Sequence, residues 1–309
     1  MNSLPYYPIS RFYQERFGEK VYKISLTTEG SCPNRNNPHQ EICVFCDEWG
    51  GAAYHQNAGL SVKEQIQHHR EKIGKRYGCR LFLAYFQTYT STFSKIAPLE
   101  KNIETALACE GICGVVIATR PDCLPQKTLE MIQRLSKQYY FSVELGVQSF
   151  QDEQLNFLKR GHSVKKSLDA IYALGSTGSV DVGLHLIFGL PGENKESLIQ
   201  TAKLINTLPV QNVKLHNLHV LKNTTLEKIY NSNGFKPVSL QEYSERVGAF
   251  LQHLSPSIAV QRLVAVASRW DDLVAPDWTR HKMAPTQTII NNMVDKSIYQ
   301  GQRAVCELR

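Results

Sequence analysis

The sequence predicts an α/β protein: a partial (β/α)6 barrel of parallel strands with a small, mostly helical C-terminal appendage. Six short runs rich in β-branched and other apolar residues are spread over residues 21–220. Segments of helix length separate them, and strands connected in this way are parallel, with right-handed crossovers. Six repeats are two fewer than a closed eight-stranded barrel needs. The alternative is a doubly wound sheet, but the first connection lacks a GxGxxG turn.

The predicted strands and helices alternate in chain order. The strands cover residues 21–27, 80–86, 114–118, 141–147, 180–188 and 212–220. Helices are expected from near Ser61, at 98–109, at 125–137, before 180 and at 198–208, where Leu198, Ala202, Ile205 and Leu208 follow helical spacing. After Thr224 the alternation stops, and a helix is expected near 241–254. We therefore divide the chain into an N-terminal extension (1–20), a core (21–224) and a C-terminal appendage (225–309).

The composition is that of an ordinary globular protein. The 309 residues are 42% apolar and 20% charged, and eight cysteines are too few for a disulfide-stapled secreted scaffold. There is no apolar signal-peptide core at the N-terminus and no uninterrupted apolar run of about 18 residues, so we expect a cytoplasmic protein without membrane spans. The net charge of +7 is compatible with an anionic partner such as RNA.

A loop directly after the first strand carries three cysteines. Cys32, Cys43 and Cys46 have the spacing C-x10-C-x2-C, and thiolates at the carboxyl end of a strand indicate a site for a soft metal. One interpretation is a [4Fe–4S] cluster on three cysteines, with one iron left open. The other is a Cys3His zinc site that includes His39. The remaining cysteines do not cluster in sequence and are expected to be core or surface thiols: Cys79, Cys109, Cys113, Cys123 and Cys306.

Further segments favour iron over zinc. In chain order they are CPNR (32–35), CVFC (43–46), YFQTYT (85–90), ATRPDCLP (118–125), VELGVQS (143–149), LKRGH (158–162), HLIFGLPGE (185–193) and KLHNLHVLKNT (214–224). Together they resemble the radical S-adenosylmethionine (radical SAM) enzymes, and within them the branch shared by the Elongator catalytic subunit and the bacterial YhcC/YtqA (MnmL-type) family. KNT stands where KGT is expected, and VAVASRW (264–270) differs from the expected GDAPR-like stretch.

The resemblance implies the cofactors and their contacts. S-adenosylmethionine (SAM) would bind the open iron, and the reduced cluster would cleave it to a 5′-deoxyadenosyl radical, with flavodoxin or ferredoxin as reducing partner. The expected SAM contacts are Phe45 and Gly189 at the adenine, Gln87 at the methionine amine, Glu144 and Gln148 on one face of a strand, and Arg160 at the methionine carboxylate. An internal polar network is the alternative for Glu144 and Gln148. A solvated helix end is the alternative for Arg160, and a plain strand-to-helix turn for Gly189.

Several other residues are candidates for substrate contact or for structure. Arg120 and Asp122 either orient substrate or tie loops together through an ion pair, and Cys123 and Tyr89 are candidate hydrogen donors. The basic stretch from Lys63 to Arg80 is expected to be a solvated helix face. Histidines within the predicted strands are expected to line the barrel or to be hydrogen-bonded in the core: His185, His216 and His219.

The Elongator-like segments imply an oxidoreductase or transferase that modifies the C5 side chain of a tRNA wobble uridine, from carboxymethylaminomethyl to aminomethyl. The alternatives are a radical SAM enzyme for a small molecule or protein and, more remotely, a non-catalytic zinc-binding module. Cations and aromatics near the C-terminus could hold phosphates and stack on bases, or the tryptophans could simply pack on the barrel. These residues are Arg262, Arg269, Trp270, Trp278, Arg280 and Lys282.

Overall fold

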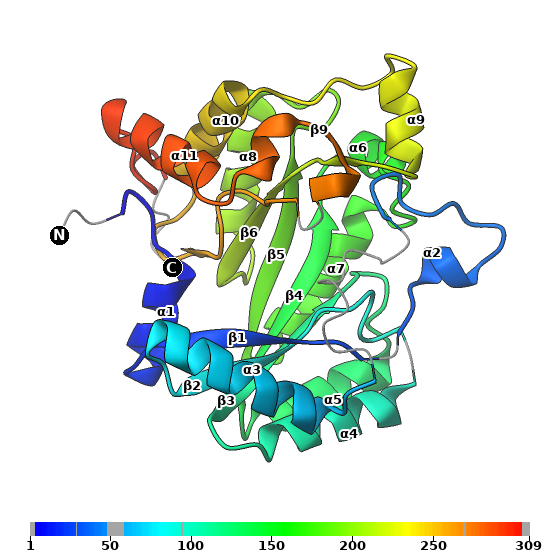
Figure 1. Ribbon diagram of the computed structural model, residues 1–309, viewed down its shortest axis with the longest axis vertical. Helices are drawn as coiled ribbons and strands as arrows, with labels where there is room; N and C mark the ends of the chain where they lie inside the picture. The colour runs from blue at the N-terminus through cyan, green and yellow to red at the C-terminus, as the bar shows by residue number, and fades with distance from the viewer. Residues whose placement is uncertain (1–3, 29, 48–58, 94, 268–269, 305–309) are drawn as a thin grey trace.

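The centre of the molecule is a parallel sheet of seven strands that curls into an open barrel (Figure 1). The computed structural model describes residues 4–28, 30–47, 59–93, 95–267 and 270–304. Successive strands lie side by side up to the sixth, as helical crossovers require. In sheet order the strands are β1 (Val21–Leu26), β2 (Leu81–Phe86), β3 (Ile112–Thr119), β4 (Tyr140–Gln148), β5 (Val180–Phe188), β6 (Asn212–Asn217) and β8 (Ala259–Val260).

The predicted alternation of helices and strands is confirmed. The helix expected near Ser61 begins with a capping box in which Ser61 and Glu64 hydrogen-bond each other's backbone N–H. The helix expected before residue 180 is in fact two helices, α6 and α7. The helices that connect the sheet strands are α2 (Pro33–Asn36), α3 (Val62–Tyr77), α4 (Ile96–Leu107), α5 (Gln126–Ser136), α6 (Asp152–Phe157), α7 (Val164–Gly175) and α8 (Lys195–Asn206).

Strand alternation separates an outer core from the inside of the barrel. In β2, Phe82 and Phe86 pack in the outer core beneath the helices, whereas Leu83 and Tyr85 belong to an inner cluster. Tyr13 of α1 (Ile9–Phe17) is part of that inner cluster. Apolar side chains therefore fill one end of the barrel, and polar inward-facing residues can gather at the carboxyl ends of the strands.

The C-terminal part is mostly helical, as predicted, but it is built into the barrel. Here β8 extends the sheet beside β6, and a short second sheet pairs β7 (Val220–Leu221) with β9 (Leu273–Ala275). The sixth strand therefore ends at Asn217 and not at residue 220. The C-terminal helices are α9 (Thr225–Asn231), α10 (Leu240–His253) and α11 (Ala284–Asp295). Of these helices, α10 lies beside α8 (Figure 1), α11 packs on α10, and α9 contacts β7. No described helix is long and apolar enough to cross a membrane.

Candidate active site

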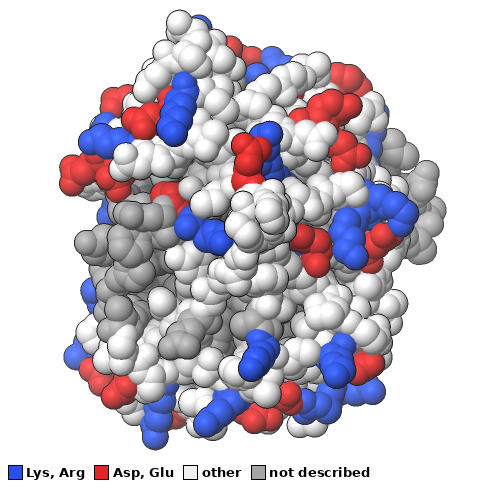
Figure 2. Space-filling model, turned by 90° about the vertical axis from the view of Figure 1, so that its right-hand side faces the viewer, with Lys and Arg blue, Asp and Glu red and all other residues white. Residues whose placement is uncertain are grey.

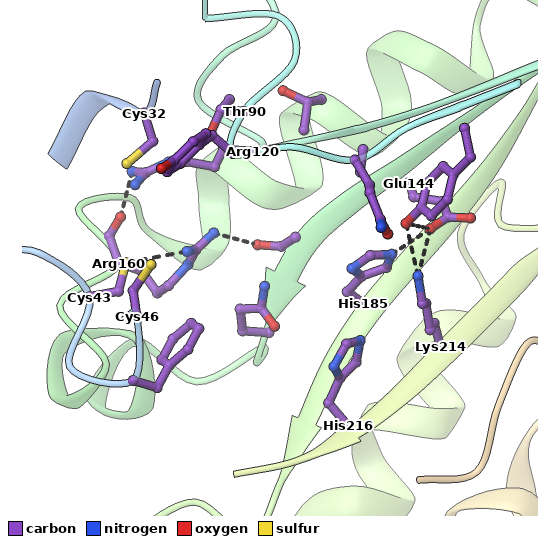
Figure 3. A pocket seen from close by; sticks show the side chains of 18 of the residues that line it. Cys32, Cys43, Cys46, Thr90, Arg120, Glu144, Arg160, His185, Lys214 and His216 are labelled. Carbon is purple, nitrogen blue, oxygen red and sulfur yellow. Dashed lines mark hydrogen bonds and ion pairs between the residues drawn. The ribbon is translucent and has the colours of Figure 1, made fainter. Parts of the chain in front are cut away.

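A cavity of about 250 Å³ lies at the carboxyl ends of the strands, where the sequence predicts the active site. Each strand from β2 to β6 contributes to its lining. The three thiols of Cys32, Cys43 and Cys46 lie at one end, and a network around Glu144 lies at the other (Figure 3). The cavity thus brings together the predicted cluster ligands and five of the six predicted SAM contacts, which are Phe45, Gln87, Glu144, Gln148 and Arg160.

The loop that carries the thiols is fixed to the segment that follows α6. The Asn34 side chain donates from Nδ2 to the carbonyls of Glu41 (2.9 Å) and Lys159 (2.8 Å). The backbone N–H of Val44 donates to the carbonyl of Leu158 (3.2 Å). These bonds hold the loop at the mouth of the barrel, with Cys43 buried and the other two cysteines half-buried.

Two arginines donate hydrogen bonds to the thiol sulfurs. Arg160 Nη1 lies 3.4 Å from Cys43 Sγ, and Arg35 Nη2 lies 3.5 Å from Cys46 Sγ. Burial raises the pKa of the Cys46 thiol, whereas the hydrogen bond from Arg35 acts in the opposite direction. Such donors stabilise thiolates that bind a soft metal.

The donor set fits an iron–sulfur cluster better than a single zinc ion. Three sulfurs face one cavity, and hydrogen bonds to sulfur are typical of such clusters. His39 is exposed. It does not line the cavity that the three sulfurs face. The Cys3His zinc site is therefore not supported.

The guanidinium of Arg160 has a hydrogen-bond donor that no described residue pairs with. The residue is 7% exposed, and its Nη2 donates to the carbonyl of Gly146 (3.0 Å). Its Nε is buried and has no partner in the described structure. An unpaired buried donor costs about 1–3 kcal/mol. A ligand carboxylate could meet this need, as expected for the methionine carboxylate of SAM.

Gln148 reaches the cavity because β4 is irregular at its end. The pairing of β4 with β5 shifts register between Leu145 and Gln148, and Gln148 has a φ of 69°. The two side chains predicted to share a strand face, Glu144 and Gln148, both line the cavity. Gln87 also lines it and makes no side-chain hydrogen bond with a described residue, which leaves its amide available for a ligand.

Gly189 is not among the residues that line the cavity. Its backbone N–H donates to Glu193 Oε1 (2.8 Å), and its φ of 90° allows the turn after β5. Gly189 thus lies in a strand-to-helix turn, which is the alternative named for it in the sequence analysis. Its contact with adenine stays a prediction.

Arg120 and Asp122 form a two-pronged ion pair that ties loops together. Arg120 Nε and Nη2 each lie 2.9 Å from an oxygen of Asp122. Arg120 also donates to Asn34 Oδ1 (2.6 Å) and to the carbonyl of Arg160 (2.5 Å). Burial favours a higher pKa for Asp122, but the hydrogen bond and charge of Arg120 hold that pKa below its ordinary value. The structure therefore favours a role in tying loops together over a role in orienting substrate.

Glu144 is the centre of the network at the inner end of the cavity. The residue is 0% exposed and forms ion pairs with Lys23 and with Lys214 Nζ (3.3 Å). It also accepts from Tyr85 Oη (2.7 Å) and His185 Nε2 (2.6 Å). Burial acts to raise the pKa of Glu144, but the charges of Lys214 and Lys23 hold it well below its usual value. This arrangement matches the internal polar network named as the alternative, and direct contact with SAM stays a prediction.

The same network contains residues that the sequence analysis did not single out. Lys23 and Lys214 occupy inward-facing positions of otherwise apolar strands. A lysine at such a position is the sequence feature that could have identified them. Burial lowers the pKa of Lys214 to about 8 and that of His185 to about 4, so this histidine is neutral near pH 7. His216 lies beside His185, with ring centroids 5.3 Å apart, and also lines the cavity.

Arg262 does not lie with the other C-terminal candidates for RNA contact. It follows β8 and lines the inner end of the cavity, where its Nε donates to the carbonyl of Leu215 (3.3 Å) and its Nη2 lies 3.0 Å from His216 Nε2. The sequence pattern could not place it there, because a strand of two residues has no recognisable periodicity.

The remaining C-terminal candidates have mixed environments. Trp278 packs against Tyr243 and donates from Nε1 to the carbonyl of Val238 (3.1 Å), as the packing alternative describes. Trp270 is 47% exposed, with Lys282 Nζ 5.5 Å from the ring centroid. Arg280 donates to the carbonyls of Trp270 and Leu273, whereas Arg269 lies outside the described residues. On the face shown in Figure 2, Lys and Arg side chains are spread among Asp and Glu.

The other sequence candidates divide between cavity and core. Tyr89 lines the cavity, whereas Cys123 is buried outside its lining, and burial raises the pKa of Cys123 to about 12. His219 is also outside the lining, and burial lowers its pKa to about 4. Most of the basic stretch at 63–80 belongs to the exposed face of α3, as expected. Cys306 lies outside the described residues.

Comparisons with known proteins cover nearly the whole chain. The model of the Radical SAM superfamily matches residues 30–205, and that of the Radical_SAM C-terminal domain matches 210–295. The chain is 28% identical over 298 residues to the uncharacterized protein YtqA of Bacillus subtilis, covering 96% of this chain and 92% of that protein. It is 32% identical over 269 residues to protein YhcC of Escherichia coli K12, covering 86% of this chain and 85% of that protein.

More distant similarities are to a protein whose name states an RNA target and to a solved structure. A tRNA uridine(34) acetyltransferase of Methanocaldococcus infernus is 35% identical over 150 residues, which are 47% of this chain and 27% of that protein. The solved structure of the archaeal M. infernus Elp3, lacking residues 1–46, matches with a TM-score of 0.70 at 19% identity. That match covers 91% of this chain and 64% of the other, so this chain spans less than two thirds of it. The structural match demonstrates a shared fold.

Proposed function

Because a superfamily model matches more than half of it, this chain belongs to the radical SAM superfamily, and we propose that it modifies the C5 side chain of a tRNA wobble uridine. Enzymes of this superfamily use a [4Fe–4S] cluster and SAM. The proposed conversion is from carboxymethylaminomethyl to aminomethyl, in the cytoplasm, with flavodoxin or ferredoxin as the source of electrons. The choice of substrate rests on the similarity over 150 residues to a tRNA uridine(34) acetyltransferase.

The residues of the cavity have separate parts in this proposal. The bound cofactors supply a 5′-deoxyadenosyl radical. Cys32, Cys43 and Cys46 hold the cluster, and Arg35 and Arg160 stabilise the thiolates by hydrogen bonds. The closed inner end of the barrel excludes water from the reacting groups.

Four cavity residues bind and orient SAM in this proposal. Arg160 binds the methionine carboxylate with its unpaired Nε, and Gln87 binds the methionine amine. Phe45 packs on the adenine, and Gln148 binds the ribose hydroxyls. Glu144 does not contact SAM in this proposal, because its carboxylate oxygens already interact with lysine, tyrosine and histidine side chains.

Arg160→Ala is expected to weaken SAM binding by about 1.5–3 kcal/mol, the scale of a charge-assisted hydrogen bond. The measurement is calorimetry on anaerobically reconstituted protein. The matched control is Arg134→Ala, which removes an arginine from the exposed surface of α5. Iron content is measured in each variant, because Arg160 also donates to Cys43. Equal SAM affinities at equal iron content would show that Arg160 does not bind the carboxylate.

The proposed function is tested with purified components. Reduced enzyme and SAM are incubated with tRNA that carries the carboxymethylaminomethyl precursor, and the wobble nucleoside and 5′-deoxyadenosine are measured by mass spectrometry. We expect loss of the precursor together with release of 5′-deoxyadenosine. Cleavage of SAM that leaves every tRNA nucleoside unchanged would favour a small-molecule or protein substrate.

A further inference from the structure

The inner end of the cavity holds more positive than negative charge. Lys23, Lys214 and Arg262 surround one carboxylate, that of Glu144, among the described residues there. The nearby His185 does not add charge near pH 7, because burial lowers its pKa to about 4. Cations enclosed in a protein are normally paired, so this excess calls for an anion.

Arg262 is the cation whose charge is least compensated. Within the described chain it forms no ion pair with a carboxylate, and its recorded side-chain bonds are to the Leu215 carbonyl and the His216 ring. Its Nη1 makes no hydrogen bond with a described residue, although the side chain lines the cavity. A planar guanidinium with a free N–H edge suits a carboxylate.

Lys214 also has bonding capacity left toward the cavity. Its Nζ donates to Tyr85 Oη (2.8 Å) and Glu144 Oε2 (3.3 Å), and an ammonium group has three donors. Lys214 and His216 follow each other on the inward face of β6, and Arg262 contacts His216. A single anion could therefore contact both cations.

We propose that Lys214 and Arg262 form a receptor for a carboxylate of the substrate, separate from the site that binds the carboxylate of SAM. The inference rests on the proposed function, and there the anion is the carboxylate of the carboxymethylaminomethyl group. Figure 3 shows Lys214 and Glu144 at the opposite end of the cavity from Arg160 and the thiols. A substrate held by its carboxylate at Lys214 would place the adjoining carbon atoms between the two ends.

A carboxylate fits this position better than a backbone phosphate of RNA. The receptor lies at the inner end of a cavity of about 250 Å³, between strands of the barrel. A backbone phosphate brings a nucleotide on either side, whereas the carboxylate ends a slender, flexible substituent. The cations at the inner end would thus recognise the modified side chain and leave phosphate binding to the outer surface.

The test compares two nucleosides that differ only in charge. Carboxymethylaminomethyluridine and its neutral carboxamide are titrated into anaerobically reconstituted protein saturated with SAM. We expect the carboxylate to bind about tenfold or more tightly than the carboxamide, as a charge-assisted hydrogen bond predicts. Arg262→Gln is expected to reduce this preference to less than about twofold. Lys165→Gln, which removes a cation from the exposed face of α7, is expected to preserve it.

Two further measurements separate the possible failures. SAM affinity should fall in Arg160→Ala but not in Arg262→Gln; the opposite pattern would assign Arg262 to SAM and overturn the receptor. Equal binding of the two nucleosides to the parent protein would also overturn it. In a parallel titration, an anticodon stem-loop with the modified uridine is compared with a scrambled hairpin. If the nucleoside preference is present but the stem-loop has no advantage, the receptor stands and the tRNA assignment fails.

Discussion

Simultaneous replacement of Cys32, Cys43 and Cys46 by alanine is expected to abolish iron binding and SAM cleavage. The parent protein, reconstituted without oxygen, should be brown and hold about four irons per chain, the content of one [4Fe–4S] cluster. In this proposal the three sulfurs that line the cavity are the cluster ligands, and the arginines beside them cannot replace a thiolate as a ligand. Iron analysis, the absorption spectrum and 5′-deoxyadenosine release measure the effect.

The matched control for this experiment removes cysteines elsewhere. Cys109 lies just before β3 and Cys113 lies within it, both away from the cavity lining, and their double replacement by alanine should leave the iron content unchanged. The cluster assignment would be contradicted by full iron content in the triple variant. It would also be contradicted by a parent protein that takes up stoichiometric zinc and no iron.

Glu144→Gln is expected to lower the free energy of unfolding by about 3–5 kcal/mol, because it leaves enclosed cations without their carboxylate. Glu144 is 0% exposed and pairs with Lys23 and Lys214. Its pKa is held well below the ordinary value of 4.5. The stabilisation is therefore complete above that value and is lost as the pH falls toward the lower pKa of the folded state. Urea denaturation of the reconstituted protein at pH 7 measures the effect.

Two variants separate the role of the Glu144 charge from general damage to the barrel. Adding Lys214→Met to Glu144→Gln removes one of the cations left without a carboxylate partner and should restore part of the lost stability. Asp169→Asn breaks an exposed i,i+4 pair with Lys165 on α7 and should leave the unfolding midpoint nearly unchanged. A Glu144→Gln protein as stable as the parent would mean that Glu144 does not balance the charges in the barrel.

The alternation of apolar strands and amphipathic helices was sufficient to predict most of the barrel. Strands β1 to β6 are long enough to show their pattern in sequence, and their order follows from right-handed crossovers. β8 could not be predicted in this way, because Ala259 and Val260 carry no periodicity. Its place beside β6 depends on packing between residues distant in sequence, and so does the position of Arg262 in the cavity.

The candidate site could be predicted where local sequence determines position. The spacing of the three cysteines and the residues that end strands, such as Gln87 and Gln148, predicted one end of the cavity. The network at the other end depends on which side chains of different strands face one another. Lys23 and Glu144, for example, come from strands that are not neighbours in the sheet, and local sequence spacing does not show that they meet.

The most direct test of the account is the nucleoside content of tRNA from a strain that lacks this protein. Mass spectrometry of the wobble nucleosides should show accumulation of the carboxymethylaminomethyl form and loss of aminomethyl-derived forms relative to the parent strain. The parent gene should restore the profile, whereas the variant with alanine at positions 32, 43 and 46 should not. Identical wobble nucleosides in the deletion and parent strains would contradict the proposed function.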